Sequence, residues 1–289
     1  MRAAAIFGPG ASEKSLRPFQ ITKTTWLTGI PTRASEVDAI LIFGGDGTVH
    51  RHLPDLVRLQ LPVLVVPCGS GNDFARALGL GSASHALAAW QRFLSADNNL
   101  RAIDLGVITL LSDPSTSYYF CCVGGVGLDA EVARRANRLP RWLRAHGGYV
   151  LTLAPSLFRL APFPMKISLP FTDTSDAFVP HSNQPTVLAA FANAPTYGSG
   201  MKIAPHAQLD DGKLDLCIIS DIDPFKLFCL FPTIYFGKHL SMREVDYLQT
   251  SRLRIETEQP LGVYADGEYV CKTPIEARVA RAALRVITP

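Results

Sequence analysis

The sequence predicts an α/β chain in which a domain with a parallel sheet is followed by a β-sandwich domain. Apolar runs at residues 37–43 and 61–67 each end in a glycine-rich turn, as buried parallel strands do before a helix. From about residue 104 onward, short β-like runs alternate with turn signals, which is typical of an antiparallel sandwich. The 289 residues suffice for two domains of roughly 100–200 residues each. We expect them at residues 1–103 and 104–289.

The composition is that of a globular protein without a strong charge bias. Hydrophobic residues make up 47% and charged residues 18%, so the chain can build packed cores. The net charge of +3 does not indicate a nucleic-acid partner. Six cysteines without CxxC pairs favour a reduced, cytoplasmic chain. The longest apolar stretch, residues 224–237, is shorter than the roughly 20 residues that span a bilayer, so membrane contact would be peripheral, at the inner face.

The first glycine turn is Gly44-Gly45-Asp46-Gly47-Thr48, directly after the apolar run 37–43. Glycines let backbone N–H groups approach a large anion without interference from a Cβ atom, as a phosphate-binding loop requires. The carboxylate of Asp46 would repel phosphate unless it faces a metal ion or a hydrogen-bond donor. An ordinary strand-ending turn is the alternative, because Gly-Asp-Gly is common in loops. This turn alone leaves both interpretations open.

A second glycine turn follows the run 61–67 and leads into a helical pattern. It comprises residues 68–72, and Ser70 or Asn72 is expected to cap a helix that contains Phe74. The N-terminus of a helix favours anions. Because the carboxyl ends of parallel strands lie at one edge of a sheet, both turns would lie where ligands bind. The pair of turns therefore favours phosphate binding.

Three further elements are expected along the chain. Residues 84–95 are amphipathic and predict a helix with Ser84 as its cap. Residues 101–110 and 117–123 flank a turn and predict a hairpin, with two adjacent cysteines in its second strand. The polar segment 172–185 is expected to be a loop between later strands.

Residues 44–48 together with residues 67–76 resemble the catalytic domain of the diacylglycerol kinase family of lipid kinases. The first motif is shared with NAD kinases and phosphofructokinases, whereas the pair at this spacing is more specific. Residues 193–215 and 263–270 extend the resemblance over nearly the whole chain. It implies a nucleotide-binding α/β domain like that of NAD kinases and diacylglycerol kinases, followed by a β-rich domain for the lipid substrate.

The resemblance implies an ATP- and Mg²⁺-dependent kinase that phosphorylates a lipid hydroxyl group, with diacylglycerol as the expected acceptor. Asp46 and Asp73 would hold the catalytic Mg²⁺ against the triphosphate, directly or through water. The nucleotide would contact residues of both turns, namely Gly44, Gly45, Asp46, Gly47, Thr48, Gly69, Ser70, Asn72 and Asp73.

Asp266-Gly267 lies between β-like runs and is typical of a hairpin turn. The resemblance implies that Asp266 is also the general base for the lipid hydroxyl, with Glu268 beside it, so the reaction would take place between the two domains. Phosphoryl transfer depends on positioning and charge stabilisation more than on a strong base, so an ordinary carboxylate suffices.

The segment 210–212 is a carboxylate-rich turn that can offer oxygen atoms to a hard cation. The resemblance implies a structural Mg²⁺ here, held by the Asp211 carboxylate and by the backbone carbonyls of Gln208 and Lys213. A plain turn without a metal ion is the alternative.

The chain departs from the family pattern in three places. Gly8 stands where the family has Asn, the segment 10–36 is short, and Val49-His50-Arg51 replaces the approach to an Asn-Glu pair. These departures weaken the expectation of ATP binding more than that of the fold. One alternative is an NAD kinase, which shares the turn at residues 44–48, and the other, suggested by the missing Asn and Glu, is a catalytically silent lipid-binding protein of the same fold.

Residues 134–144 carry five arginines with a tryptophan among them. This composition suits an anionic membrane surface, and a solvated helix-loop-helix is the equal alternative. The sequence leaves open which lipid is phosphorylated and whether the chain forms a homodimer.

Overall fold

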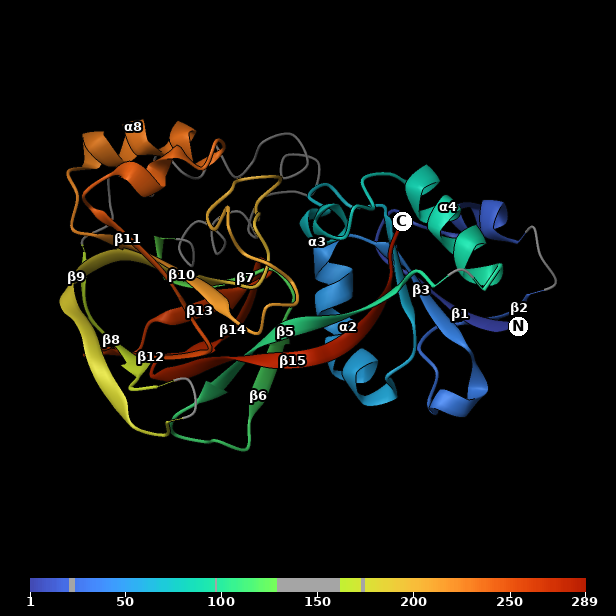
Figure 1. The fold of residues 1–289 in the computed structure, drawn as a ribbon, viewed down its shortest axis with the longest axis horizontal. Coiled ribbons are helices and arrows are strands. Elements are labelled where there is room, and N and C mark those ends of the chain that lie inside the picture. Colours follow the sequence, from blue (N-terminus) through green and yellow to red (C-terminus); the bar gives the residue numbers. More distant parts are fainter. Residues whose placement is uncertain (21–23, 97, 129–161, 173–174) are drawn as a thin grey trace. The chain divides into compact units, whose positions relative to one another are not determined.

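Figure 1 shows the computed structural model of the chain, which describes every residue except 21–23, 97, 129–161 and 173–174. Contacts between Cα atoms divide the chain into two compact units. Unit 1 comprises Met1–Leu105 and Arg281–Pro289, and unit 2 comprises Gly106–Ala280. The sequence predicted a boundary near residue 103 and kept the C-terminal residues in the second domain, whereas the structure returns these residues to unit 1.

The last strand explains why the C-terminus belongs to unit 1. The end of β15 (Ile275–Ile287) pairs in parallel with β4 (Val63–Pro67). Asn99 fixes this end of the chain, because its Nδ2 donates to the Thr288 carbonyl at 2.8 Å and its carbonyl accepts from the Thr288 N–H at 2.9 Å. Unit 1 therefore completes its sheet with residues from both ends of the sequence.

The parallel sheet of unit 1 has the strand order β2-β1-β3-β4-β15. After β1 the chain places β2 on one side and β3 on the other, so the strand order reverses between β1 and β3. In open α/β sheets, ligands bind at the carboxyl ends of the strands at such a reversal. The elements of this unit are β1 (Arg2–Phe7), α1 (Glu13–Leu16), η1 (Arg17–Phe19), β2 (Thr25–Thr28), η2 (Ala34–Glu36), β3 (Ala39–Gly44), α2 (Asp46–Leu59), β4, α3 (Asp73–Ala77), α4 (Ala83–Leu94) and the first half of β5 (Leu100–Leu110).

The helix predicted at residues 84–95 is confirmed, but its predicted cap is wrong. α4 begins at Ala83, and the Oγ of Ser82 accepts from the His85 N–H at 3.2 Å. Ser84 is already inside the helix, where its Oγ lies 2.7 Å from that of Ser82. Because Ser82 and Ser84 are both suitable cap residues, the sequence alone did not show which of them begins the helix. In the folded unit, α4 packs against β4 and α2 packs against β3.

Unit 2 is built from antiparallel strands, as the sequence predicts. β9 organises the unit, because its first half pairs with β8 and its second half lies between β7 and β10. The predicted hairpin is confirmed by the pairing of β5 with β6. The elements are β6 (Ser117–Phe120), β7 (Val123–Gly127), β8 (Phe163–Pro170), β9 (Phe178–Ala192), β10 (Leu214–Ser220), α8 (Pro224–Ile234), η3 (Lys238–Ser241), β11 (Val245–Thr250), β12 (Arg252–Thr257), β13 (Gly262–Ala265), β14 (Glu268–Lys272) and β15.

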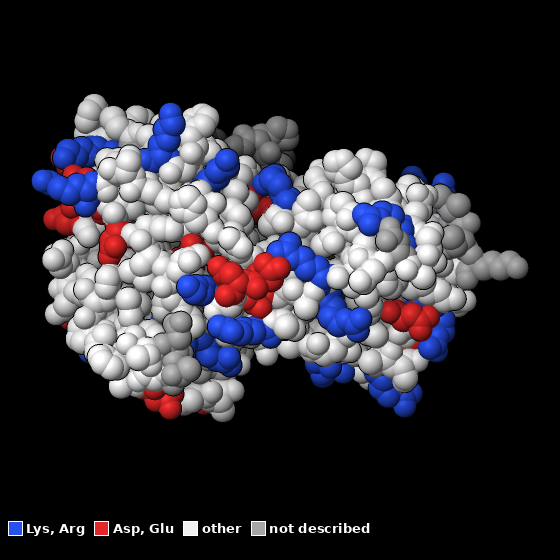
Figure 2. All heavy atoms as spheres, in the orientation of Figure 1, with Lys and Arg blue, Asp and Glu red and all other residues white. Residues whose placement is uncertain are grey.

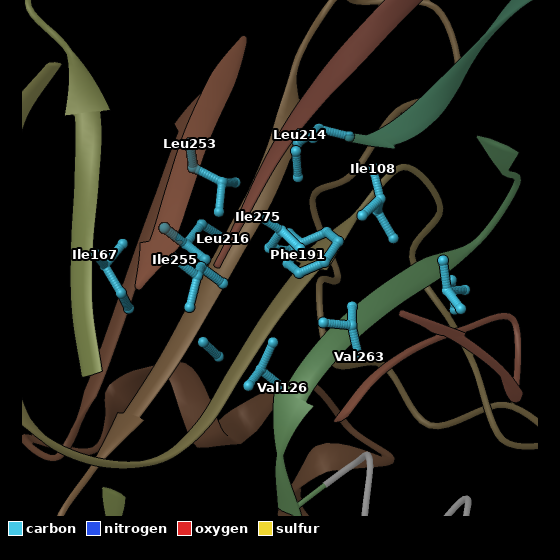
Figure 3. Packing of buried hydrophobic residues seen from close by; sticks show 14 of the residues in the cluster. Ile108, Val126, Ile167, Phe191, Leu214, Leu216, Leu253, Ile255, Val263 and Ile275 are labelled. Atoms are coloured by element: carbon cyan, nitrogen blue, oxygen red, sulfur yellow. The ribbon is translucent and has the colours of Figure 1, made fainter. Parts of the chain in front are cut away.

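The core of unit 2 comes from residues that alternate along these strands. Leu214, Leu216 and Ile218 of β10 are buried in one cluster with side chains of neighbouring strands. Figure 3 shows Phe191 of β9 at the centre of this packing. A Cβ atom on Gly124 would lie 2.2 Å from the Phe191 ring, so glycine in β7 makes room for it. The sandwich core is thus dense enough to hold its turns in fixed positions.

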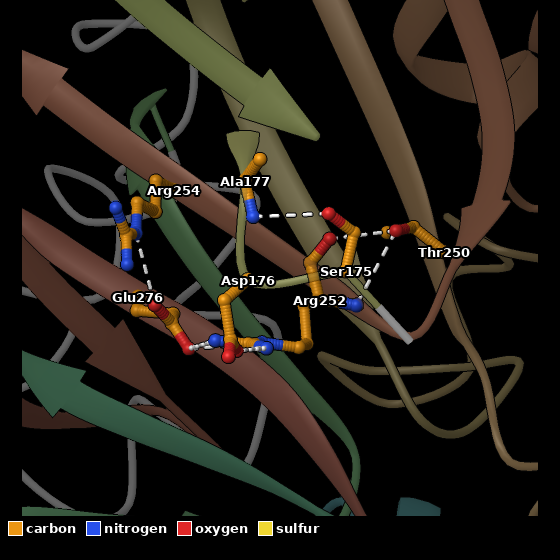
Figure 4. A network of polar contacts seen from close by, with 7 residues as sticks. All are labelled: Ser175, Asp176, Ala177, Thr250, Arg252, Arg254 and Glu276. Atoms are coloured by element: carbon orange, nitrogen blue, oxygen red, sulfur yellow. Dashed lines mark hydrogen bonds and ion pairs between the residues drawn. The ribbon is translucent and has the colours of Figure 1, made fainter. Parts of the chain in front are cut away.

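A polar network covers the outside of the same strands and corrects the predicted loop 172–185. Arg252 and Arg254 both reach the Glu276 carboxylate, with N–O distances of 2.9 Å (Figure 4). The Arg254 guanidinium also lies 3.9 Å from the centre of the Phe178 ring. Phe178 is therefore the first residue of a strand, and the polar residues after it face solvent while their backbone pairs with β8.

Candidate active site

The two glycine turns of unit 1 touch each other through their backbones. The first leads from β3 into α2 through Gly45, and the second leads from β4 into α3. A Cβ atom on Gly69 would lie 2.6 Å from the Cα of Gly45, which is closer than real Cβ atoms approach. Only glycine fits at both positions, since each backbone occupies the space of a side chain on the other. The two turns therefore lie together at the carboxyl edge of the sheet, as the sequence predicts.

Asp46 joins the first turn to the helix after the second. Its Oδ2 accepts from the Asp73 N–H at 3.1 Å, and its Oδ1 accepts from the Phe74 N–H at 2.9 Å. These amides belong to the first turn of α3, where backbone N–H groups have no partner within the helix. From the sequence we expected a metal ion or a hydrogen-bond donor beside the Asp46 carboxylate, and in the structure two backbone N–H groups donate to it.

Asn72, one of the two predicted caps, is the N-cap residue of α3, but its side chain makes no capping hydrogen bond, and Asp46 accepts from the first helix amides. The Asn72 side chain instead closes the second turn, donating to the Gly69 carbonyl at 2.6 Å and accepting from the Gly69 N–H at 2.8 Å. Asp73 is buried, and its carboxylate forms an ion pair with Arg76 at 2.6 Å. Asn72 and Asp73 thus shape the turn through contacts of their own.

Exposure separates the predicted nucleotide-binding residues into three groups. Gly69 and Ser70 are exposed, so the second turn presents its backbone to solvent. Gly44, Thr48 and Asp73 are buried and support the turns from inside. The half-buried residues are Gly45, Asp46, Gly47 and Asn72.

Gly8, which replaces the family's Asn, lies at the carboxyl end of β1 next to Thr48. A Cβ atom on Gly8 would lie 2.2 Å from the Thr48 Oγ1, and one on Gly44 would lie 2.6 Å from the same atom. The threonine side chain therefore fills the space that side chains at positions 8 and 44 would need. The glycine at position 8 therefore leaves room for the buried Thr48 side chain.

In unit 2, Asp266 and Gly267 form the predicted hairpin turn between β13 and β14. Their φ values of 51° and 84° identify a type I′ turn. The Asp266 Oδ2 accepts from the Cys121 N–H at 2.9 Å, and its Oδ1 accepts from the Cys122 N–H at 2.8 Å. The turn thus aims one carboxylate at two successive amides. Glu268, the first residue of β14, is exposed.

Cys121 and Cys122 do not lie in the second strand of the hairpin, where the sequence predicted them. β6 ends at Phe120 and β7 begins at Val123, with a bend between them. The amides of Cys121 and Cys122 donate to Asp266 and not to a neighbouring strand. The hydrogen bonds to this carboxylate therefore account for the break in the ladder.

The thiols of these cysteines lie close to the same carboxylate. The Cys121 Sγ is 3.4 Å from the Asp266 Oδ2 and 4.0 Å from the Cys122 Sγ. Within the described part of the chain, this is the one group of three side chains whose ligand atoms could share a metal ion. Both thiols are buried, as is common for cysteines that pack like small apolar side chains.

The predicted cation-binding turn belongs to a polar cluster on β10 and β11. The Asp211 Oδ1 accepts from the Lys213 N–H at 3.0 Å, and its Oδ2 accepts from the Gln249 Nε2 at 3.3 Å. The same Nε2 lies 3.3 Å from both oxygens of Asp215, whose Oδ1 also accepts from the Tyr247 hydroxyl at 2.5 Å. The turn therefore shares its donors with a carboxylate on the adjacent strand.

Sequence reasoning missed Asp215 and its two donors. Burial raises the pKa of Asp215, the hydrogen bonds from Tyr247 and Gln249 oppose this shift, and the charge of Asp211 adds to it. Burial likewise raises the pKa of Tyr247. The available signal was a single acidic residue inside the apolar run 214–219, because a buried charge in a strand needs partners. The membrane-binding prediction for residues 134–144 lies outside the described residues.

Comparison with known families covers both units. Residues 16–108 match the model of the diacylglycerol kinase catalytic domain, and residues 123–288 match that of the YegS C-terminal NAD kinase beta sandwich-like domain. The diacylglycerol kinase of Mycobacterium tuberculosis is 34% identical over 256 residues, which is 89% of this chain and 78% of that protein. The diacylglycerol kinase of Bacillus subtilis is 25% identical, over 93% of this chain and 85% of that protein.

Two solved structures share the fold. A diacylglycerol kinase from Bacillus anthracis aligns with a TM-score of 0.67 at 19% identity, covering 100% of this chain and 97% of that one. An NAD kinase from Archaeoglobus fulgidus in complex with ATP aligns with a TM-score of 0.56 at 14% identity, covering 100% and 94%. The α/β unit, the β-sandwich unit and these relatives together show that the chain is a kinase and belongs to the diacylglycerol kinase family of lipid kinases.

Proposed function

We propose that the protein transfers the γ-phosphoryl group of ATP to the hydroxyl group of diacylglycerol, giving phosphatidic acid and ADP. Relatives named diacylglycerol kinase support the acceptor, and the fold shared with an NAD kinase in complex with ATP supports the donor. The observation that carries the proposal is the Asp266 carboxylate, which two amides hold in one orientation at the end of a rigid hairpin.

Unit 1 would bind the nucleotide at the two glycine turns. They lie where the strand order reverses, and the exposed backbone at Ser70 offers an N–H group to phosphate oxygens. The first turn of α2 adds further amides, since it begins directly after Gly45. The buried residues Gly44 and Thr48 would hold these donors in place.

Unit 2 would supply the base. As the lipid oxygen forms its bond to the γ-phosphorus, the bond to the bridging oxygen of ADP breaks and the hydroxyl proton moves to the Asp266 carboxylate. The two oxygens of a carboxylate carry about four lone pairs, and at Asp266 the amides of Cys121 and Cys122 bind one on each oxygen. The amide bonds fix the direction in which these lone pairs point. Glu268 would lie beside the acceptor as a second carboxylate.

Mg²⁺ would neutralise charge on the phosphates. Asp46 suits it, because this half-buried carboxylate provides hard oxygen donors at the edge of the turn. Asp73 would act close by, although its ion pair with Arg76 favours a role in shaping the turn. The cluster of Asp211 and Asp215 offers oxygen donors for a structural Mg²⁺, with the carbonyls of Gln208 and Lys213 as further ligands.

The proposal is tested by incubating the purified protein with labelled ATP and Mg²⁺. The acceptors are diacylglycerol in mixed micelles, a sphingoid base, ceramide, phosphatidylglycerol and NAD, each in a separate reaction. We expect label in phosphatidic acid, and loss of that product when EDTA removes Mg²⁺. Label in NAD and in no lipid would replace the proposal by NAD kinase activity. Lipid binding without turnover of any acceptor would indicate the catalytically silent alternative.

A further inference from the structure

Helix α8 (Pro224–Ile234) of unit 2 and the two residues that follow it carry a row of exposed aromatic side chains. The exposed fractions are 71% for Phe225, 48% for Phe228 and 73% for Phe236, and Tyr235 is exposed to 36%. Phe225 and Phe228 are three residues apart and lie on one face of the helix, and Tyr235 and Phe236 directly follow its last residue, Ile234. Large apolar side chains gathered in this way mark a surface that interacts with another partner.

The opposite side of α8 already serves the fold. Leu227 and Ile234 are seven residues apart and each is only 4% exposed, so they face the body of unit 2. Asp223 caps the helix, because its Oδ1 accepts from the Phe225 N–H at 2.9 Å. The helix is therefore anchored by its cap and by its buried side, which the aromatic row does not supply.

Basic residues flank the aromatic row. Lys226 follows Phe225 in the sequence, Lys238 lies beyond Phe236, and the Lys202 N–H donates to the Ile234 carbonyl at 3.1 Å at the end of α8. Arg243 is 91% exposed and lies 4.0 Å from the Glu244 carboxylate, which also pairs with Lys226 at 3.2 Å, so the two cations share one acidic partner. In Figure 2, Lys and Arg spheres lie among uncharged ones in the region where Figure 1 places α8, with Asp and Glu spheres at its left edge.

We propose that α8 lies in the interface of an anionic lipid bilayer, with its aromatic row inserted and its basic residues at the head groups. This combination is typical of helices that bind a membrane surface without crossing it. No helix in the described part of the chain is long and apolar enough to cross a bilayer. The inference rests on the proposed function, because a kinase for diacylglycerol must reach an acceptor that stays in the membrane.

Vesicle flotation without nucleotide tests the surface directly. The full chain is mixed with vesicles of phosphatidylcholine alone or with phosphatidylglycerol added, and Phe225→Ser/Phe228→Ser is compared with the wild type. We expect the variant to bind at least about tenfold more weakly, since burial of a phenylalanine side chain changes an equilibrium by more than that factor. Phe171→Ser is the matched control, because Phe171 is 72% exposed but lies outside α8, and its binding should stay unchanged.

The charges are tested with Lys238→Gln/Arg243→Gln. This variant should bind anionic vesicles about tenfold more weakly and neutral vesicles as the wild type does. Unchanged flotation of the aromatic variant would overturn the inference. So would a wild-type dimer that the aromatic substitutions convert into a monomer, because a second copy would then cover the row.

Activity separates this inference from the proposed function. The aromatic variant should phosphorylate a short-chain diacylglycerol dissolved as monomers at the wild-type rate and lose turnover of long-chain diacylglycerol in vesicles. Equal loss on both substrates would contradict membrane docking as the role of α8. If the wild type floats through its aromatic row but phosphorylates no lipid, the proposed function fails and the docking surface stands.

Discussion

Asp46 in unit 1 and Asp266 in unit 2 bind the backbone in the same way in different surroundings. Each carboxylate accepts from the N–H groups of two successive residues that lie far away in the sequence. For Asp46 these amides start helix α3, whereas for Asp266 they form the bend between β6 and β7. The sequence motifs predicted a metal-binding role for Asp46 and a catalytic role for Asp266, and in the structure each aspartate also links distant segments of its own unit through hydrogen bonds.

The two aspartates differ in backbone conformation. Asp46 is the first residue of α2, while Asp266 adopts a φ of 51°, a left-handed conformation that few side chains tolerate. Alanine at position 46 or 266 would therefore remove the acceptor of two backbone amides as well as any catalytic carboxylate. Asparagine keeps the size of the side chain and one acceptor oxygen, so comparing the alanine and asparagine variants separates the structural role from the catalytic one.

The largest effect is expected for Asp266→Asn in the kinase assay. The amide cannot accept the lipid proton, so kcat should fall by about 10²–10⁴-fold, the usual contribution of a general base. Glu268→Gln is the matched control at the edge of the same turn, and its kcat should fall far less. A kcat for Asp266→Asn within a few-fold of the wild type would contradict the assignment of the base.

The next effect concerns stability, measured by urea unfolding of Asp266→Ala and Asp46→Ala. Each substitution leaves two amides without their acceptor, at about 1–3 kcal/mol for a buried group left unpaired. Asp266→Ala should be the more destabilising, because alanine also carries the strain of a positive φ. Asp266→Gly removes that strain and should recover about 1 kcal/mol relative to alanine. Equal stabilities of the alanine and glycine variants would show that the turn relaxes.

A smaller effect is expected where the two glycine turns meet. Gly69→Ala places a Cβ atom 2.6 Å from the Cα of Gly45, and backbone cannot move aside as a flexible side chain can. The variant should lose about 1–3 kcal/mol in free energy of unfolding and bind ATP more weakly. Gly81→Ala is the control, since its Cβ atom would lie 3.7 Å from the nearest atom. Equal thermal stability of both variants would argue against a tight contact between the turns.

The smallest effect concerns Asp215, a carboxylate held by side-chain donors in place of amides. Burial raises its pKa in the folded protein, so the folded state binds this proton more tightly than the unfolded chain does. Its contribution is therefore most favourable below the ordinary carboxyl pKa of about 4 and is lost as the pH rises through the raised value. Asp215→Asn has no such titration and does not lose this stability. The melting temperature of the variant minus that of the wild type should therefore increase as the pH rises from about 4 through the raised pKa of Asp215. A constant difference would contradict the raised pKa.

Much of unit 1 could be predicted because its signals are local. The apolar run 37–43 and the glycines after it determine a strand and a turn by themselves. Gly45 and Gly69 also indicate a close approach of backbones, since glycine is the residue that permits it. The role of Asn72 could not be predicted, because Asp46, which replaces it as the partner of the helix amides, lies in another turn.

The errors in unit 2 have the same origin. Cys121 and Cys122 belong to a β-rich run, and only a carboxylate 145 and 144 residues away breaks the strand there. Residues 178–185 are polar enough for a loop, and they form a strand because β8 pairs with their backbone and Arg254 covers Phe178. Asp215 was overlooked because its donors lie on a strand that follows more than 25 residues later. Contacts that are distant in the sequence leave no local pattern to read.

The return of the C-terminal residues to unit 1 has a consequence for synthesis on the ribosome. The last strand lies beside β4, and the Ala282 N–H donates to the Asp104 carboxylate at 2.7 Å, so the first unit lacks an edge until the final residues have been made. Unit 2 has all of its sequence between those two segments and can form earlier. The part of the chain that is translated first therefore cannot complete its sheet until unit 2 has been translated.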